Sequence, residues 1–358
     1  MEAAPTEPQA LTLSQVETGG GNALLGISFS VQQGEVLGLI GPDGAQVLSA
    51  IAGFARVRAG EVTIDGHLSL ETPPHRRRIG MVSRNRDVFS HLSVADNIRL
   101  SPYSEPRLAN SLLDGLDLRA IAKRRPVGLS ADIMLRIALA RALAQRPRLL
   151  LLEDPMAELG GDDADWLKSW LRGWAREQGV AVVVASEAAQ AFYGLADRVA
   201  ALHGGRLHQI GTAQELHDQP KTLFVAQAMG ETNLLRGQIT ALDHGIATLR
   251  LPGGVAVEGT AVNAMRPGME CVLSIRPERL AIADMHPTDI FEGALPAKLR
   301  RTVFAGMCTR LSLELVLGAG HRADMIASRP CGAALPRNGS VGVAWQPAHA
   351  SVFSVDLC

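Results

Sequence analysis

The pattern of apolar and polar positions divides the chain near residue 230. Before that point, continuous apolar runs alternate with stretches whose apolar residues recur at helical spacing. The apolar runs are residues 36–40, 149–152 and 180–185, and the helical stretches are residues 96–143, 162–178 and 188–196. Such runs are typical of strands buried in a parallel sheet, and strand–helix alternation is typical of a doubly wound sheet. The sequence therefore predicts an α/β domain over residues 11–230, with a helical subdomain at 90–145.

Beyond residue 230 the helical spacing disappears, and short strands separated by Gly and Pro take its place. They are residues 237–241, 246–251, 255–258 and 270–275, followed by a comparable series over residues 293–355. Many short strands at regular spacing are typical of small β-barrels. We therefore expect an all-β, OB-like domain over residues 231–358, built as two lobes or as one lobe of two halves. Residues 1–10 are acidic and contain Pro, and they are predicted to form a disordered tail.

Composition narrows the possible partners. The 358 residues carry a formal net charge of −1, which gives no overall attraction to nucleic acid or to an anionic membrane. No apolar run approaches the roughly 18 residues that a membrane-spanning helix needs, and the N-terminus lacks the features of a secretory signal. The four cysteines are far apart, so reduced thiols are expected and no metal site is predicted. We expect neither nucleic-acid binding nor direct membrane insertion.

A glycine turn lies between the first buried strand and the helical stretch that follows it. Its residues are Gly41, Pro42, Asp43, Gly44 and Ala45. A phosphate-binding loop of the pattern G-x-x-x-x-G-K-[ST] is expected at such a junction, but the final Gly-Lys-Ser/Thr is absent. That Lys would reach the β- and γ-phosphates of a nucleotide, and the hydroxyl would hold Mg²⁺. What remains is the start of a helix at about Gln46, a weak and generic anion site.

The order of the remaining motifs resembles the ATP-binding subunit of an ABC importer. Residues 41–53 are similar to the Walker A region, with three residues missing between Ala45 and Gln46. Other matching segments are residues 79–84 with 89–98 (Q-loop), 129–130 with 136–143 (signature helix) and 149–155 (Walker B). Residues 229–235, 274–279 and 343–347 resemble the C-terminal TOBE-like barrel of polyamine-type and ferric-type importers.

This resemblance implies a P-loop NTPase-like fold and ATP with Mg²⁺ as cofactors. It also implies two kinds of partner at the inner membrane, which are permease subunits and a second ATP-binding subunit in a homodimer or heterodimer. The chain would then be peripheral on the cytoplasmic face. The helical region between Ile98 and Leu129 is shorter than is usual in the family, whereas Phe89 and His91, which precede it, are retained for docking.

The resemblance also places each site residue, and many positions depart from the family pattern. Arg84 stands at the Q-loop glutamine, and Ser186 stands at the switch histidine. The signature segment is Leu129, Ser130, Ala131, Asp132 and Ile133, in which Ala and Asp replace glycines that approach phosphate. Walker B ends in Glu153-Asp154, the reverse of the usual order, and a shift of about 1 Å at such a position can cost on the order of 10²-fold in rate.

Three hypotheses follow. In the first, the chain is an importer subunit with weak or absent ATP binding and hydrolysis, a pseudo-ATPase. In the second, it is a working ATPase with rewired ligands, in which Arg84 replaces the missing Lys and Glu153 holds Mg²⁺. In the third, it is a non-catalytic regulatory or scaffold subunit that acts through its C-terminal barrels. The basic cluster of residues 76–78 with Arg84 and Arg86 is either a solvated face or a contact for phosphate or lipid headgroups.

Overall fold

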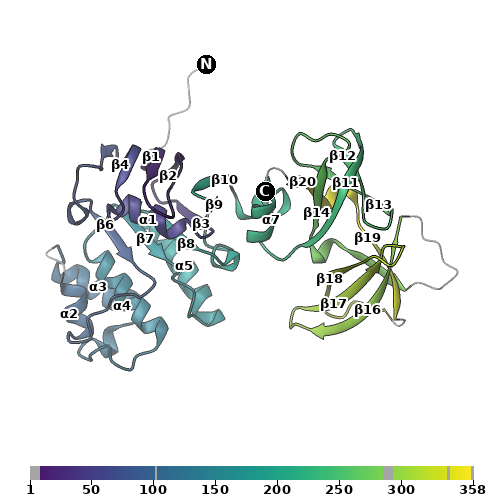
Figure 1. Cartoon of the computed structure of the whole chain (residues 1–358). Helices are drawn as coiled ribbons and strands as arrows, with labels where there is room; N and C mark the ends of the chain where they lie inside the picture. Colours follow the sequence, from purple (N-terminus) through teal and green to yellow (C-terminus); the bar gives the residue numbers. More distant parts are fainter. Residues whose placement is uncertain (1–8, 101–102, 285–292, 337–338, 356–358) are drawn as a thin grey trace, which may run out of the picture. The chain divides into compact units, whose positions relative to one another are not determined.

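The computed structural model describes residues 9–100, 103–284, 293–336 and 339–355. The chain forms two compact units, Met1–Ala213 and Gln214–Cys358 (Figure 1). The sequence places its domain boundary later, after residue 230. Of the tail expected at residues 1–10, residues 1–8 lie outside the described residues, and Gln9 and Ala10 open the first strand.

The first unit is built on a six-stranded sheet with the order β10-β9-β3-β8-β7-β6. The neighbours β9/β3, β3/β8, β8/β7 and β7/β6 are parallel, and only β10 is antiparallel to its neighbour. The strands are β3 (Val36–Ile40), β6 (Ile79–Val82), β7 (Leu149–Glu153), β8 (Ala181–Ser186), β9 (Arg198–His203) and β10 (Arg206–Gly211). The predicted α/β fold with a mostly parallel sheet is confirmed.

A second, antiparallel sheet has the order β2-β1-β4-β5. Its strands are β1 (Gln9–Thr18), β2 (Ile27–Gln32), β4 (Val57–Ile64) and β5 (His67–Leu68). Helix α1 (Gly44–Ala52) shares one hydrophobic core with both sheets: Leu13 of β1, Leu48 of α1 and Leu151 of β7 all belong to it. The start of α1 is therefore fixed by packing from both sides.

The stretch predicted as helical over residues 96–143 is divided into several helices. They are α2 (Val94–Arg99), α3 (Pro106–Gly115), the 3₁₀ turn η2 (Arg119–Ile121) and α4 (Ala131–Leu143). The other helical elements of this unit are the 3₁₀ turn η1 (Pro74–Arg76) and α5 (Gly161–Gln178). Among the helices that the structure describes, none combines the length and apolar character that crossing a membrane requires.

The helix predicted over residues 188–196 is wrong. Only the short 3₁₀ turn η3 (Ala189–Ala191) forms, and the chain then turns at Gly194, whose φ is +76°. Phe192 is fully buried, and its ring lies so close to Gly38 that a Cβ there would be 2.5 Å from the ring. Insertion of this ring beside the central strand β3 takes the place of a continued helix.

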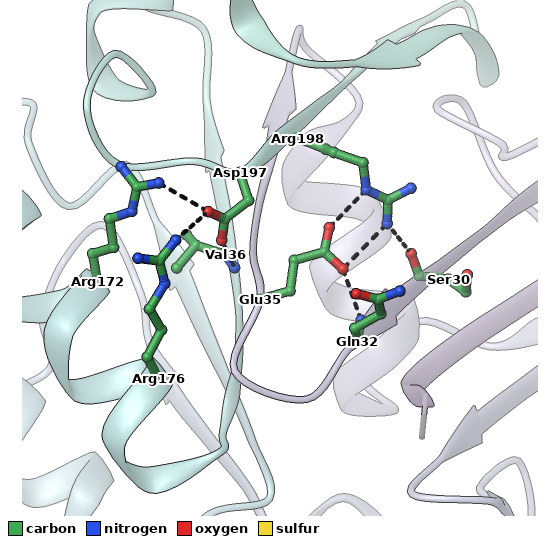
Figure 2. A network of polar contacts seen from close by, with 8 residues as sticks. All are labelled: Ser30, Gln32, Glu35, Val36, Arg172, Arg176, Asp197 and Arg198. Carbon is green, nitrogen blue, oxygen red and sulfur yellow. Dashed lines mark hydrogen bonds and ion pairs between the residues drawn. The ribbon is translucent and has the colours of Figure 1, made fainter. Parts of the chain in front are cut away.

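Two carboxylates anchor the start of β3, as Figure 2 shows. Glu35 is buried, accepts a hydrogen bond from the Gln32 backbone N–H (2.7 Å), and pairs with Arg198 at 2.7 Å and 3.2 Å. Asp197 accepts from the Val36 N–H at 3.0 Å on one oxygen. Its other oxygen accepts from two arginines of α5, Arg172 at 3.1 Å and Arg176 at 3.0 Å. This network joins α5 and β9 to the beginning of β3, just before the glycine turn.

Replacement of Glu35 by Ala is expected to lower the free energy of unfolding of the first unit by about 2 kcal/mol, because it removes charge-assisted hydrogen bonds. Urea unfolding followed by tryptophan fluorescence reports on this unit, since three of the four tryptophans (Trp166, Trp170 and Trp174) lie on α5. The exposed Glu177 provides a matched control as Glu177→Ala. An equal, small effect of both substitutions would show that the network contributes little.

The second unit contains helices α6 (Ala213–Asp218) and α7 (Leu223–Ala228) and two β structures with one common core. A closed barrel has the order β11-β12-β13-β20-β14. Its strands are β11 (Asn233–Asp243), β12 (Ile246–Arg250), β13 (Ala256–Ala261), β14 (Glu270–Ile275) and β20 (Ala350–Ser354). The barrel is closed by the last strand of the chain, which pairs with both β13 and β14.

A five-stranded sheet packs with this barrel in the order β15-β19-β16-β17-β18. Its strands are β15 (Ala281–Asp284), β16 (Leu295–Phe304), β17 (Cys308–Val316), β18 (Arg322–Pro330) and β19 (Ser340–Ala344), with the 3₁₀ turns η4 (Pro277–Arg279) and η5 (Pro347–His349). The buried Asn233 side chain joins the two parts, because it accepts from the Ile326 N–H (2.7 Å) and donates to the Ile326 carbonyl (2.8 Å). The predicted all-β C-terminal domain is confirmed.

Candidate functional site

The glycine turn is closed by its own backbone. Helix α1 begins at Gly44, two residues before the helix start expected from the sequence. The Gly44 N–H donates to the Gly41 carbonyl at 3.3 Å, and the Gly41 N–H donates to the Ser186 carbonyl of β8 at 3.4 Å. A phosphate-binding loop uses its backbone N–H groups to surround phosphate oxygens. Here two of those groups already have protein acceptors.

Side-chain contacts hold the turn in this form. Asp43 precedes α1 but does not cap it with its side chain; it is buried and accepts a hydrogen bond from the Gly205 N–H at 2.8 Å. Gly44 is buried against the sheet, since a Cβ at this position would lie 3.0 Å from the Ala185 Cβ and 3.3 Å from the Leu39 carbonyl oxygen. The turn and the first residue of α1 are therefore packed directly onto the ends of β3 and β8.

A cavity of about 60 Å³ lies beside this turn. Its lining residues are Gly41, Pro42, Ala45, Arg84, Glu153, Asp154, Ala185, Ser186 and Glu187. Seven of them belong to the site predicted from the sequence, so residues that are up to 145 positions apart come together at one edge of the sheet. Three carboxylates and one guanidinium face this small space, giving the lining a formal charge of −2.

The two carboxylates that follow β7 have different surroundings. Asp154 accepts a hydrogen bond from the Ser186 hydroxyl at 2.9 Å, and its backbone N–H donates to the Ala185 carbonyl at 2.8 Å. Its φ of +49° lies in the left-handed region, which is uncommon for a residue other than Gly. Glu153 accepts a long hydrogen bond of 3.4 Å from the Arg84 N–H. Ser186 therefore orients Asp154, while Glu153 is tied to the Q-loop segment.

Arg84 reaches the edge of this cavity rather than its interior. Its Nε lies 3.8 Å from Asp154 Oδ2, and its side chain is 70% exposed. At that exposure an ion pair is screened by water and contributes at most about 1 kcal/mol.

The signature-like segment lies elsewhere. Leu129 and Ser130 precede α4, and residues 131–133 form its first turn, none of them in the lining of the cavity. The Ser130 hydroxyl donates to the Asp132 carboxylate, which also lies 3.7 Å from Arg136. Arg136 stacks 4.1 Å from the ring centre of Trp166. Asp132 is therefore held by Ser130 and Arg136, which belong to the same segment and do not line the cavity.

The Q-loop segment is fixed by α4. Arg141 donates to the backbone carbonyls of Asp87 (2.6 Å) and Arg86 (3.3 Å), and its guanidinium lies 5.1 Å from the ring centre of Phe89. Burial lowers the pKa of Arg141, and the nearby Asp87 partly offsets this effect. Arg86 pairs with Glu158 at 2.7 Å. Both arginines thus have structural partners.

The three arginines at residues 76–78 do not together form one exposed basic face. Arg77 is buried, and its guanidinium donates to the carbonyls of Ala50 (3.3 Å), Ile51 (2.7 Å) and Thr72 (2.8 Å). The Ala50 and Ile51 carbonyls are at the C-terminal end of α1, where a cation interacts favourably with the helix dipole. Burial lowers the pKa of Arg77. For this residue, both sequence-based interpretations are wrong, since it neither faces solvent nor is available to phosphate.

Some residues of the site were not found from the sequence. Ala185 and Glu187 line the cavity, and Gly205 donates the hydrogen bond that holds Asp43. Ala185 and Glu187 flank Ser186, so their adjacency was available as a signal. Gly205 is 162 residues from its partner in sequence, and no local pattern points to the pair.

Comparison with known proteins identifies both parts of the chain. Residues 24–157 match the family model "ABC transporter", and residues 273–353 match "TOBE domain". The chain is 31% identical over 315 residues to the "Spermidine/putrescine import ATP-binding protein PotA" of Trichodesmium erythraeum, covering 84% of this chain and 82% of the relative. The protein of the same name from Nostoc sp. is 30% identical over 311 residues, covering 83% and 81%.

Solved structures agree on the fold. The structure of cbiO1 from Clostridium perfringens aligns with a TM-score of 0.54 at 19% identity, covering 60% of this chain and 92% of that one. A nucleotide-free ATP-binding cassette from an ABC transporter aligns with a TM-score of 0.56 at 18% identity, covering 62% of this chain and 100% of that one. The predicted P-loop NTPase-like fold is confirmed, and the family implies ATP and Mg²⁺ as ligands. The chain belongs to the ATP-binding subunits of ABC transporters and carries a C-terminal TOBE domain.

Proposed function

We propose that this chain is an ATP-binding-type subunit of a polyamine importer that does not itself bind Mg-ATP productively. The observation that carries this proposal is the closed turn at residues 41–44, with its cavity of about 60 Å³. Sites for drug-sized ligands have volumes of roughly 300–1,000 Å³. The space between the turn and the carboxylates that follow β7 is therefore much smaller than a nucleoside triphosphate with Mg²⁺.

Charge supports the same conclusion. Of the described residues that line the cavity, only Arg84 is cationic, against Glu153, Asp154 and Glu187. A triphosphate would meet a net negative lining, and phosphoryl transfer depends on neutralising the charge of the phosphates. We infer that ATP and Mg²⁺ bind weakly or not at all at this turn, and that Asp154 and Ser186 serve to hold the loop.

We infer that this subunit still docks on a permease. A surface groove of about 630 Å³ is lined by apolar, aromatic and basic side chains: Ala52, Phe54, Pro74, His75, Arg76, Arg78, Ile79, Met81, Tyr103 and Gln145. Phe54 and Tyr103 are 68% and 65% exposed, so this groove presents two large rings to solvent. A permease segment with an apolar side is the occupant that we favour, which would place the chain at the cytoplasmic face of the inner membrane.

A sibling ATP-binding subunit would then supply hydrolysis. The names of the relatives above describe them as importing spermidine and putrescine. This is our reason for proposing polyamines as the solute. In a dimer with an active sibling, this chain would dock on the permease and regulate transport without hydrolysing ATP itself. Asp132, which stands where the family has a signature glycine, would bring negative charge toward the phosphates on the sibling.

Polyamine uptake in cells tests this proposal. Deletion of the gene for this chain is expected to lower spermidine and putrescine uptake. Expression of the wild type, of Glu153→Ala or of Asp154→Ala is expected to restore it equally, because these carboxylates are not used for hydrolysis. Glu177→Ala serves as the control for a carboxylate outside the site. Failure of Asp154→Ala to restore uptake, at normal protein level, would overturn the pseudo-ATPase; unchanged uptake after deletion would overturn the polyamine assignment.

One observation favours the alternative of a working ATPase. Arg84 lies at the rim of the cavity and, being exposed, has room to rotate toward it. In that case Arg84→Gln would abolish uptake in the same assay. In the pseudo-ATPase, we expect Arg84→Gln to restore uptake as the wild type does.

A further inference from the structure

A pocket of about 220 Å³ lies in the second unit, and four stretches of the chain line it. They are the end of α6 with the two residues that follow it, α7, the end of β14 with η4, and η5 with the start of β20. The last residue of β14 is paired with the first residue of β20, so the pocket lies at that end of the barrel. Eight of its eleven lining residues are polar or charged. It shares no residue with the cavity beside the glycine turn, which belongs to the first unit.

The buried part of this lining holds a fixed cation. Ser274 and Arg276 are 6% and 7% exposed. The Arg276 guanidinium donates to three backbone carbonyls, those of Gly230 (2.8 Å), Glu231 (3.1 Å) and His217 (3.3 Å). These bonds hold the guanidinium in place before any ligand arrives, and the carbonyls carry no net charge that would cancel its own. At a buried position, such a cation attracts an anion more strongly than it would in water.

The exposed part of the lining carries one carboxylate and a second guanidinium. Asp218 Oδ1 lies 3.0 Å from His217 Nδ1 and 3.4 Å from Arg279 Nη2. The hydrogen bond with His217, more than the charge of Arg279, holds the pKa of Asp218 below its ordinary value, so this carboxylate is ionised at neutral pH. Glu278 lies 3.5 Å from the other ring nitrogen of His217 but does not line the pocket. With neutral histidines, the lining has a formal charge of +1, opposite in sign to that of the cavity beside the glycine turn.

We propose that this pocket, the Arg276 pocket, binds the carboxylate group of a small organic acid. Guanidinium groups suit carboxylates because their planar N–H donors match the two oxygens, and the hydroxyls of Ser274 and Ser351 add possible donors. The volume is below the roughly 300–1,000 Å³ of sites for drug-sized ligands, so it suits an acid of a few carbons. A polyamine would meet a lining of its own sign of charge. Because α6, α7 and the barrel all contribute to the lining, a bound acid would fasten the helices to the barrel and give a metabolite control over the second unit.

Isothermal calorimetry with succinate and with L-glutamate, each titrated into the full-length chain, tests this site. We expect saturable binding of at least one of the two acids. Arg279→Gln is expected to weaken it about tenfold, the effect of losing one charge-assisted contact. Ala348→Glu is expected to weaken it by a similar factor, because it adds a negative charge at an exposed position of the lining. Ser274→Ala is expected to weaken it several-fold, since it removes a buried hydroxyl.

Arg250→Gln is the matched control, since Arg250 is exposed on β12 and does not line the pocket. A loss in this control as large as in Arg279→Gln would overturn the proposal, because it would indicate attraction to general surface charge. Absence of saturable binding of both acids would overturn it as well. Sulfate that binds as tightly as the better acid would also contradict it, since the pocket would then be a general anion site.

Hydrogen–deuterium exchange with a saturating acid locates the site without any substitution. We expect slower exchange of the backbone amides at residues 217–219 and 348–351, which line the pocket, and unchanged exchange in β3 of the first unit. No slowing at either stretch would place the acid elsewhere and overturn the proposal. The two acids distinguish the sources of the carboxylate: tighter binding of L-glutamate supports an amino acid, tighter binding of succinate supports an acid without an amino group, and equal binding supports recognition of the carboxylate alone.

Discussion

Insertion of Gly-Lys-Ser between Ala45 and Gln46 is expected to raise the Mg²⁺-dependent affinity of the chain for ATP by about 100-fold or more. The inserted Lys restores a contact to the phosphates and the inserted Ser restores a Mg²⁺ ligand. Each charge-assisted hydrogen bond contributes roughly 1.5–3 kcal/mol, and each 1.4 kcal/mol is tenfold in affinity. The insertion falls in the first turn of α1, directly after the turn that the Gly44–Gly41 hydrogen bond closes.

Insertion of Gly-Ala-Ala at the same point is the matched control, since it lengthens the chain equally but adds neither the cation nor the hydroxyl. Equilibrium binding of a fluorescent ATP analogue, with Mg²⁺ and with EDTA, measures both variants. We expect a gain only for Gly-Lys-Ser and only with Mg²⁺. An equal gain for both insertions would show that the closed turn alone, and not the missing side chains, limits binding.

Replacement of Phe192 by Ala is expected to lower the free energy of unfolding of the first unit by about 3–5 kcal/mol, because it leaves a cavity in the core. The ring is fully buried and lies against Gly38 in the central strand β3, three residues before the glycine turn. Urea unfolding followed by tryptophan fluorescence measures the loss. Phe54→Ala is the control, since the same atoms are removed from a ring that is 68% exposed.

A second substitution tests the contact itself. In the wild type, Gly38→Ala places a Cβ 2.5 Å from the Phe192 ring and is expected to cost about 1–3 kcal/mol by overpacking. In the background of Phe192→Leu, the same change should cost less, because the smaller side chain leaves space. Equal costs in both backgrounds would contradict the direct contact between these two residues.

The sequence predicts the architecture well because its strongest signals are periodic. The apolar runs at residues 36–40, 149–152 and 180–185 correspond to β3, β7 and β8, and the change of pattern near residue 230 precedes an all-β region. Helical spacing failed at residues 188–196, where the burial of Phe192 against Gly38 outweighs local preference. A contact between positions 154 residues apart cannot be predicted from the pattern of about ten neighbouring residues.

The structure brings together several residues that the sequence proposed for the site, but the sequence did not predict the conformation of the turn beside them. Motif order proposed one site for Gly41, Arg84, Glu153 and Ser186, and they lie near one another because they follow strands that end at the same edge of one sheet. The sequence did not predict that α1 starts at Gly44, because the packing of Gly44 on Ala185 is a tertiary contact. The basic run at residues 76–78 illustrates the same limit, since the structure uses Arg77 to cap the end of α1.

A titration of ATP against the purified full-length chain, with Mg²⁺ and with EDTA and with phosphate release followed in parallel, probes the closed turn itself. We expect that Mg²⁺ does not lower the Kd for ATP below about 1 mM. We also expect no phosphate release that depends on Asp154. Micromolar binding that requires Mg²⁺, with turnover that Asp154→Ala abolishes, would show instead that the turn opens to hold the triphosphate.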